Sequence, residues 1–333
     1  MPGKPIVVAQ MPQWCFERMF RLSDLAKLKE YADLSGPIDR KSGELAGLLK
    51  EAKVVLTGWG TPRIDDEFLR MSPELGLVAH TAGSVKGLVG DAIFDRGIRV
   101  TTAAGANAVP VAHFTVAMMV SLLKQVPWIS KAFSAGDQAE IDRRKAACRE
   151  LQDIDVAIIG ASRVGRVVIE LLQDYSEVRI KLYDPYIDEA QARSMGVSKV
   201  SLDEACGCEV ISIHAPSIPE TKHMINARTL ALMPDHAVLI NTARGSLIDE
   251  NALISEVRRR PLYVALDVTQ PEPPAPDSPL RTEPNVVLTP HIAGAMKQAC
   301  KDMGQLAINE VIRFLSGERL TAEVTQSMMP TQA

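Results

Sequence analysis

Residues 154–184 constrain the fold more than any other stretch, because they read as strand, tight turn, helix and second strand in immediate succession. Residues 154–159 are mostly apolar, as in a strand covered on both faces. The turn at 160–165 follows at once, apolar residues then recur at helical spacing, and a second strand at 179–183 ends at Asp184. This pattern predicts a dinucleotide-binding βαβ unit, in which the helix N-terminus faces the pyrophosphate and Asp184 accepts hydrogen bonds from a ribose diol.

The middle position of the turn departs from the usual pattern. Ser162 stands where a glycine normally lets the backbone approach the pyrophosphate. Its Cβ narrows that approach, although its hydroxyl can donate to a phosphate oxygen. The alternative interpretation is a sheet-to-helix turn that binds no cofactor. The distance in sequence from the turn to Asp184 matches the dinucleotide-binding pattern and therefore favours the cofactor interpretation. The predicted cofactor contacts in this unit are Gly160, Ser162, Arg163, Val164, Gly165 and Asp184.

Length and composition indicate a two-domain globular enzyme. A chain of 333 residues exceeds one ordinary core, and a charged content of 23% is typical of globular proteins. The net charge of -4 gives no reason to expect nucleic acid or an anionic membrane as partner. The N-terminus shows no targeting pattern, and no apolar run approaches the roughly 20 residues of a membrane span. The five scattered cysteines favour reduced thiols in the cytoplasm and no metal site.

Short strands alternate with helices along most of the chain, which predicts an α/β fold with parallel sheets. Before residue 104, strands are expected at 5–9, 54–57, 75–80 and 98–102, and helices at 16–31, 44–50, 65–71 and 92–96. A small-residue crossover at 103–110, a buried helix at 111–124 and an exposed polar arm at 136–150 are expected next. Later helices are expected at 187–195, 226–233 and 250–259, and strands at 210–214, 237–241, 262–266 and 286–288. A final helix ending at Gly317 is expected to return to the first domain.

Polar residues follow three predicted strands, at 241–245, at 267–272 and at 289–291. The carboxyl ends of parallel strands meet at one edge, where open α/β sheets bind ligands. Hydride transfer between a nicotinamide and a carbonyl needs a proton donor, a group that orients the donor, and a cation for the substrate carboxylate. His291, Glu272 and Arg244 are residues of these types. Taken singly each is more often a structural ion-pair residue, but their order and spacing together favour a site.

Three segments resemble the D-isomer-specific 2-hydroxyacid dehydrogenases: INTARGSLID at 240–249, ALDV at 265–268 with PEP at 271–273, and LTPHIAG at 288–294. The resemblance implies a Rossmann-type cofactor domain at 104–292, inserted in a smaller flavodoxin-like α/β substrate domain formed by 1–103 and 293–333. It implies that Arg244 binds substrate, that Glu272 pairs with His291, and that His291 is the acid/base. The further contacts expected are Thr242, Ala243 and Asp267 for the cofactor, and the backbone amides of Gly83 and Ser84 for the substrate carboxylate.

The resemblance implies an NAD-dependent interconversion of a D-2-hydroxy acid and its 2-keto acid. It also implies a homodimer that forms through the cofactor domain, and the cysteine content favours the cytoplasm. Asp184 favours NAD over NADP because its carboxylate repels a 2′-phosphate, whereas Arg163 and Lys181 are cations that can soften this preference. Glyoxylate or hydroxypyruvate is favoured slightly over phosphohydroxypyruvate, because Arg63 gives thin support for a phosphate pocket. The alternative is a non-catalytic NADH-sensing protein similar to the corepressors of the family.

The other histidines are not accompanied by acidic or basic residues at predicted strand ends, as His291 is. His80, His223 and His236 are expected to be structural or surface residues, and His214 is expected near the cofactor lip. His80 is also a candidate to surround the far end of the substrate, together with Trp59, Arg63 and Lys86. His113 stands where the family usually has glutamate, so it puts the packing of the crossover helix in question.

Overall fold

The computed structural model describes residues 3–331 and divides the chain into two units. Unit 1 contains residues 1–107 and 295–333, and unit 2 contains residues 108–294. The boundaries expected from the sequence are 103/104 and 292/293. The first crossing falls inside helix α6 (Ala104–Leu123), so the helix begins in unit 1 and continues through unit 2.

Unit 1 is a six-stranded sheet in the order β13-β5-β4-β3-β1-β2. Strands β1 to β5 are parallel, and their order is that of flavodoxin-like folds, while β13 adds an antiparallel edge. The strands are β1 (Ile6–Gln10), β2 (Asp33–Ile38), β3 (Ala52–Thr57), β4 (Leu77–His80), β5 (Arg99–Thr102) and β13 (Glu323–Val324). The helices are α1 (Gln13–Met19), α2 (Leu22–Tyr31), α3 (Leu45–Leu49), α4 (Asp66–Met71), α5 (Asp91–Asp95) and α14 (Lys297–Leu315).

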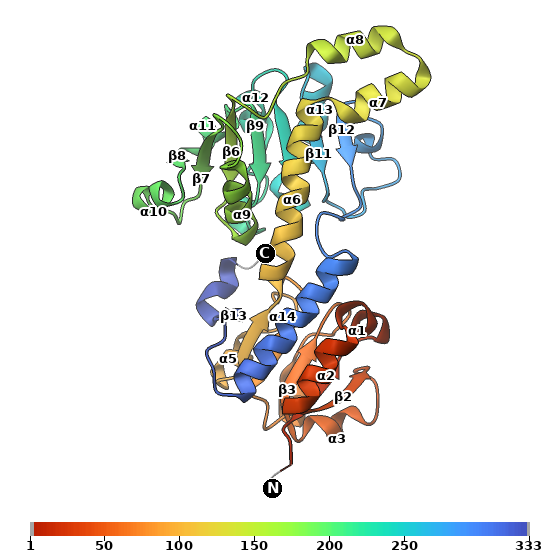
Figure 1. Ribbon diagram of the computed structural model, residues 1–333, viewed down its shortest axis with the longest axis vertical. Helices are drawn as coiled ribbons and strands as arrows, with labels where there is room; N and C mark the ends of the chain where they lie inside the picture. Colours follow the sequence, from red (N-terminus) through yellow and green to blue (C-terminus); the bar gives the residue numbers. More distant parts are fainter. Residues whose placement is uncertain (1–2, 332–333) are drawn as a thin grey trace. The chain divides into compact units, whose positions relative to one another are not determined.

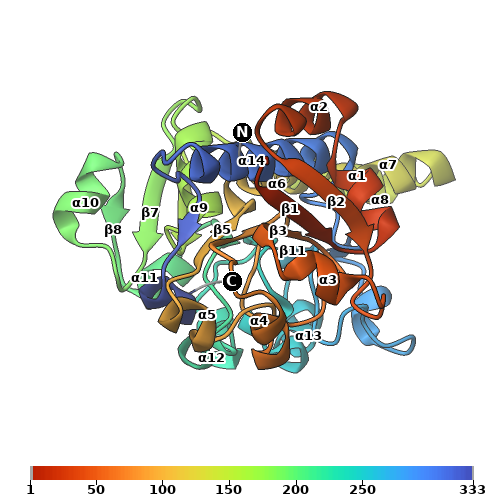
Figure 2. The same cartoon turned by 90° about the horizontal axis from the view of Figure 1, so that it is seen from below.

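The C-terminal helix α14 belongs to unit 1. It lies beside α1 and α2 (Figures 1 and 2), and its buried residues Met303, Ile308 and Val311 pack with residues of the sheet. Its Glu310, which is fully buried, accepts hydrogen bonds from the backbone N–H groups of residues 321 and 322, both at 2.9 Å. The chain that leads into β13 is therefore tied to α14.

Three details of unit 1 differ from the sequence prediction. The helix expected at 16–31 is two helices, because Phe20 and Arg21 adopt extended backbone between them. Strand β2 was not predicted, since its sequence contains Gly36 and Pro37 and lacks an apolar alternation. Strand β13 was not predicted either, because two residues are too few to give a pattern.

Unit 2 is a seven-stranded parallel sheet in the order β12-β11-β10-β9-β6-β7-β8, which confirms the predicted Rossmann-type fold. The strand order reverses between β6 and β9, where such sheets bind ligands. The strands are β6 (Asp155–Ile159), β7 (Arg179–Tyr183), β8 (Ser198–Lys199), β9 (Val210–Ile213), β10 (Val238–Asn241), β11 (Tyr263–Leu266) and β12 (Val286–Leu288). Besides α6 the helices are α7 (Val126–Ala135), α8 (Gln138–Ala146), α9 (Arg163–Leu172), α10 (Glu189–Ser194), α11 (Leu202–Cys206), α12 (Ala227–Ala231) and α13 (Glu250–Arg259).

Helix α6 corrects two expectations. The stretch expected as a crossover is its first part, with Pro110 inside the helix. At 20 residues it is also long and apolar enough to cross a membrane by length and composition, contrary to the expectation that no apolar run has that length. However, Val116, Met119 and Leu122 are buried in the core of unit 2, and the Thr115 hydroxyl lies 3.0 Å from another hydroxyl of that unit. These contacts make α6 a core helix.

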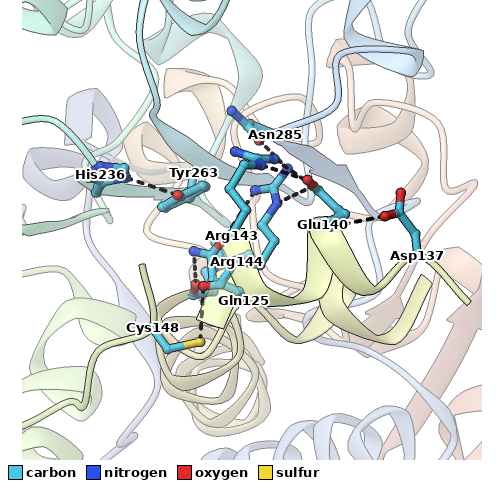
Figure 3. Close-up of polar contacts among 10 residues, drawn as sticks. Gln125, Asp137, Glu140, Arg143, Arg144, Cys148, His236, Tyr263 and Asn285 are labelled. Carbon is cyan, nitrogen blue, oxygen red and sulfur yellow. Dashed lines mark hydrogen bonds and ion pairs between the residues drawn. The ribbon is translucent and has the colours of Figure 1, made fainter. Parts of the chain in front are cut away.

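Helices α7 and α8 form an arm that extends from the sheet of unit 2 (Figure 1). The sequence predicted an exposed polar arm here but not its helices or its anchor. Arg144, which is 4% exposed, donates to Gln125 Oε1 and to Asn285 Oδ1, both at 3.1 Å (Figure 3). Its guanidinium also lies 5.0 Å from the ring centroid of Trp128 and 5.9 Å from that of Tyr263. A buried cation with these partners fixes the base of the arm to β11 and to the residue before β12.

Candidate active site

The turn after β6 has the close backbone packing that a dinucleotide-binding turn requires. Gly160 has φ +101°, and a Cβ on it would lie 2.7 Å from the backbone nitrogen of Ala215. A Cβ on Gly165 would lie 2.1 Å from the Gly160 carbonyl oxygen. Both positions therefore need glycine, and their contacts place the N-terminus of α9 directly above the end of β6.

Ser162, the departure from the glycine pattern, is the N-cap of α9. Its hydroxyl oxygen accepts a hydrogen bond from the Gly165 backbone N–H at 3.3 Å. The hydroxyl keeps its own proton while it caps the helix, so it can still donate to a phosphate oxygen. The adjacent Arg163 side chain is exposed and makes no polar contact with any other residue in the described range 3–331.

Asp184 stands at the carboxyl end of β7 and is bound to the same turn. Its two oxygens accept the backbone N–H groups of Ala161 at 2.7 Å and of Tyr186 at 2.8 Å. Each carboxylate oxygen keeps a lone pair for a ribose hydroxyl. Lys181 forms an ion pair at 2.7 Å with Asp155, the first residue of β6, and this contact raises the pKa of Lys181. Lys181 is therefore engaged at the amino end of the sheet, whereas the residues at the carboxyl end fit a dinucleotide.

His214, predicted near the cofactor lip, packs against the turn at Gly160 and Gly165. It is 3% exposed, and burial lowers its pKa to about 3. Its Nε2 lies 2.8 Å from the Ser212 hydroxyl, while its Nδ1 is buried without a partner among the described residues. The imidazole is therefore neutral near neutral pH.

The loop after β10 is shaped by Asn241, which the sequence places in the polar cluster at 241–245 without a role of its own. Its side-chain Nδ2 donates to the Arg244 carbonyl at 2.8 Å, and its Oδ1 accepts the Ala243 N–H at 3.0 Å. A Cβ on Gly245 would lie 2.1 Å from the carbonyl carbon of Thr269, so the loops after β10 and β11 touch. Full burial of a polar side chain at a strand end could have identified Asn241.

Arg244 lies in that loop as a partly buried cation. One of its guanidinium nitrogens donates to the Ala243 carbonyl at 2.6 Å. Burial lowers the pKa of Arg244, and the charge of Glu272 opposes that shift. The structure therefore brings Arg244 within the electrostatic reach of Glu272. Thr242, predicted with Ala243 to contact the cofactor, places its hydroxyl 3.0 Å from the hydroxyl of Thr115.

Asp267 holds the loop that follows β12. Its carboxylate, which is 2% exposed as a residue, accepts the Thr289 hydroxyl at 2.6 Å. It also accepts the backbone N–H groups of Ile292 at 2.8 Å and of Ala293 at 2.9 Å. The predicted contact with a nicotinamide carboxamide would use the acceptor capacity that remains.

The predicted pair of His291 and Glu272 lies together in the structure. His291 Nδ1 is 2.6 Å from Glu272 Oε1, and the His291 backbone N–H donates to the carbonyl of Asp267 at 3.0 Å. His291 has φ +54°, an uncommon conformation for a residue with a side chain. The side chains are 54% and 41% exposed, so the pair is open to a ligand at the carboxyl edge of the sheet.

The remaining predicted site residues, Gly83 and Ser84, belong to unit 1. They follow β4 in a half-buried loop, and their backbone N–H groups donate to no other residue between 3 and 331. His80, at the end of β4, places its Nδ1 2.9 Å from the Thr57 hydroxyl, and burial lowers its pKa to about 4. Its structural role was predicted. His113 is exposed on α6.

Comparison with known proteins gives consistent matches. The curated D-3-phosphoglycerate dehydrogenase of Methanocaldococcus jannaschii is 30% identical over 308 residues, which cover 92% of this chain and 58% of that protein. D-3-phosphoglycerate dehydrogenase 2, chloroplastic, of Arabidopsis thaliana is 29% identical over 91% of this chain and 48% of its own length. The chain thus spans about half the length of these relatives.

Solved structures share the fold. The TT0316 protein from Thermus thermophilus has a TM-score of 0.74 at 26% identity. The match spans 96% of this chain and 100% of the TT0316 chain. A D-2-hydroxyisocaproate dehydrogenase has a TM-score of 0.79 at 22% identity over 96% of this chain and 99% of its own. The family profile described as D-isomer specific 2-hydroxyacid dehydrogenase, NAD binding domain, matches residues 116–293. That match spans more than half of the sequence, and the chain therefore belongs to the D-isomer-specific 2-hydroxyacid dehydrogenase family.

Proposed function

We propose that the chain is an NAD-dependent dehydrogenase that interconverts a D-2-hydroxy acid and its 2-keto acid. The observation that carries the proposal is the 2.6 Å contact between His291 Nδ1 and Glu272 Oε1, with Arg244 close enough to be affected by the charge of Glu272. An imidazole bound to a carboxylate and a cation for a planar anion are what reduction of a 2-keto acid requires.

Each residue has a defined task in this proposal. Bound NADH would supply hydride from C4 of its nicotinamide, and NAD would accept it in the reverse direction. Because Glu272 occupies Nδ1, His291 donates the proton to the carbonyl oxygen from Nε2 and removes it during oxidation. Arg244 binds the substrate carboxylate through its fork. In unit 1, the N–H groups of Gly83 and Ser84 donate to no other described residue and are available as donors to a carboxylate.

Turnover separates this enzyme from the NADH-sensing alternative. The purified chain is mixed with NADH and a panel of 2-keto acids that includes glyoxylate, hydroxypyruvate and phosphohydroxypyruvate, and NADH absorbance is followed. Steady consumption with one member of the panel supports the dehydrogenase. Tight NADH binding without consumption of NADH by any member supports the sensor.

Cofactor choice depends on Asp184 and Arg163. The Asp184 carboxylate can bind ribose hydroxyls but repels a 2′-phosphate, and Lys181 is already paired with Asp155. We therefore propose NAD as the preferred cofactor, with Arg163 as the cation that sets how strict the preference is. A higher kcat/KM with NADPH than with NADH would contradict this assignment.

For the substrate we keep the preference for glyoxylate or hydroxypyruvate. Arg63 is exposed after β3 and makes no side-chain polar contact with another residue of the described range, but one arginine is weak support for a phosphate. The relatives named D-3-phosphoglycerate dehydrogenase favour phosphohydroxypyruvate instead. The variant Arg63→Ala decides between them. A loss of roughly tenfold or more in kcat/KM for phosphohydroxypyruvate, with glyoxylate reduction spared, would reverse our order.

We also propose that the protein is a cytoplasmic homodimer and that the α7–α8 arm contributes to the contact. Val126 and Phe133, seven residues apart on one face of α7, are 50% and 75% exposed. All five cysteines are free, in keeping with a reducing compartment. Analytical ultracentrifugation of the wild type and Phe133→Ser tests the contact. A wild-type monomer at micromolar concentration would contradict it.

A further inference from the structure

Thr102, the last residue of β5, contacts the loop that contains Gly83 and Ser84. The residue is 2% exposed, and its hydroxyl donates to the carbonyl oxygen of Ala82 at 2.8 Å and also to that of Gly83. The two carbonyls therefore share one hydroxyl proton. All of these groups belong to unit 1.

The orientation of a carbonyl fixes the orientation of the N–H group in the same peptide unit. A trans peptide is planar, and its C=O and N–H bonds point in opposite directions. The Ala82 carbonyl shares a peptide plane with the Gly83 N–H, and the Gly83 carbonyl shares one with the Ser84 N–H. Because Thr102 binds both carbonyls on one side, both N–H groups are turned to the other side. Neither N–H group donates to another residue between 3 and 331.

The two peptide planes are not held equally. The Ala82 carbonyl also accepts the backbone N–H of Ala103 at 3.0 Å. The Gly83 carbonyl accepts a hydrogen bond from Thr102 and from no other donor in the described part of the chain. Gly83 has no side chain that would restrict its backbone, and the space where a Cβ would lie is open within 4 Å. The Thr102 hydroxyl is thus the restraint on the Gly83–Ser84 peptide.

We propose that Thr102 is a positioning residue that keeps the N–H groups of Gly83 and Ser84 directed toward the substrate carboxylate. The proposal rests on the proposed dehydrogenase function. It assigns to Thr102 no contact with substrate or cofactor. Without the Thr102 hydroxyl, the Gly83–Ser84 peptide loses this hydrogen bond. Its N–H group must then be oriented when the carboxylate binds, and this ordering weakens binding.

The test compares Thr102→Val, which keeps the side-chain shape but removes the hydroxyl, with Thr102→Ser, which keeps the hydroxyl. Thr101→Val is the matched control, because Thr101 is as deeply buried but its hydroxyl makes no hydrogen bond to residues 3–331. We expect Thr102→Val to raise KM for the 2-keto acid and the dissociation constant of oxamate about tenfold. NADH affinity should stay within about twofold, and Thr102→Ser and Thr101→Val should resemble the wild type.

Several results would overturn the positioning role. These are an unchanged oxamate affinity in Thr102→Val, an equal loss in Thr101→Val, or no rescue by Thr102→Ser. If Thr102→Val does not fold, as judged by its thermal transition, Thr102→Ala carries the same comparison. Oxamate binding to the NADH complex also separates this proposal from the function. A wild type that binds oxamate but reduces no 2-keto acid refutes the dehydrogenase, whereas the variants still report on Thr102.

Discussion

Each unit buries one histidine in its neutral form, which predicts a loss of stability in weak acid. Burial lowers the pKa of His80 in unit 1 to about 4 and that of His214 in unit 2 to about 3, from a usual value of 6.5. In the unfolded chain both bind a proton near pH 6.5. The free energy of unfolding is therefore highest above that pH, and it falls as the pH drops toward about 4 for His80 and about 3 for His214.

The size of the effect follows from linkage. pH 5 lies about 1.5 units below the usual histidine pKa, so each of these histidines is almost fully protonated in the unfolded chain at that pH. In the folded state both remain almost entirely neutral. Each histidine should thus lower the free energy of unfolding by about 2 kcal/mol between pH 7 and pH 5. His80→Asn keeps a polar atom near Nδ1, which contacts Thr57, and His214→Gln keeps one near Nε2, which contacts Ser212. Both variants remove the titration.

Urea unfolding at pH 7 and at pH 5, monitored by circular dichroism, gives the free energy of unfolding of the wild type and of each variant. The free energy of unfolding of the wild type falls between pH 7 and pH 5. We expect this fall to be about 2 kcal/mol smaller in each variant. Hydrogen exchange assigns the effect to a unit, because His80→Asn should alter the acid sensitivity of amides in unit 1, and His214→Gln that of amides in unit 2. An equal loss of unfolding free energy in the wild type and in both variants between pH 7 and pH 5 would refute a role of these two histidines in acid sensitivity.

Three further predictions concern the site. His291→Gln should lower kcat by about two to four orders of magnitude. The affinity for NADH, measured by fluorescence titration, should stay nearly unchanged. Full activity of this variant would rule out the proposed mechanism. Glu272→Gln should lower kcat less than His291→Gln does, because the imidazole keeps its place but loses the carboxylate at Nδ1. An unchanged kcat counts against the pairing. Gly165→Ala should weaken NADH binding at least about tenfold, since its Cβ would overlap the Gly160 carbonyl. Gly207→Ala, with its nearest atom at 3.4 Å, is the control in the same unit, and equal losses in both would refute the argument.

The sequence predicted those parts of the fold that have a strong local pattern. The βαβ unit ending at Asp184 has apolar strands, glycines at both ends of the turn and an amphipathic helix, and the structure agrees with it closely. Strand β2 could not be predicted, because Gly36 and Pro37 are poor strand formers and only pairing along β1 makes the segment a strand. The break between α1 and α2 was missed, because the apolar spacing continues through Phe20.

Much of the site was predictable because chemistry selects residue types. The sequence named His291, Glu272 and Arg244 by residue type and by their order at strand ends. The structure places His291 Nδ1 2.6 Å from Glu272 Oε1, and the catalytic roles of all three residues stay predictions. Two residues hold the loops. Asn241 was named only as a member of the polar cluster at 241–245, without a role, and Thr102 was not identified. Each acts through hydrogen bonds to carbonyls or N–H groups whose positions depend on the tertiary fold, and asparagine and threonine carry no pattern that predicts such contacts.

The division of unit 1 between the two ends of the chain determines when it can fold during synthesis. On the ribosome, β1 to β5 emerge before unit 2, and α14 and β13, which complete their sheet, emerge after it. Until then one face of their sheet lacks the apolar cover of α14, and β5 has an open edge that later binds β13. Unit 2 is contiguous and can fold first. A ribosome that stops before Glu310 would therefore release a folded cofactor unit attached to an unfinished, aggregation-prone sheet.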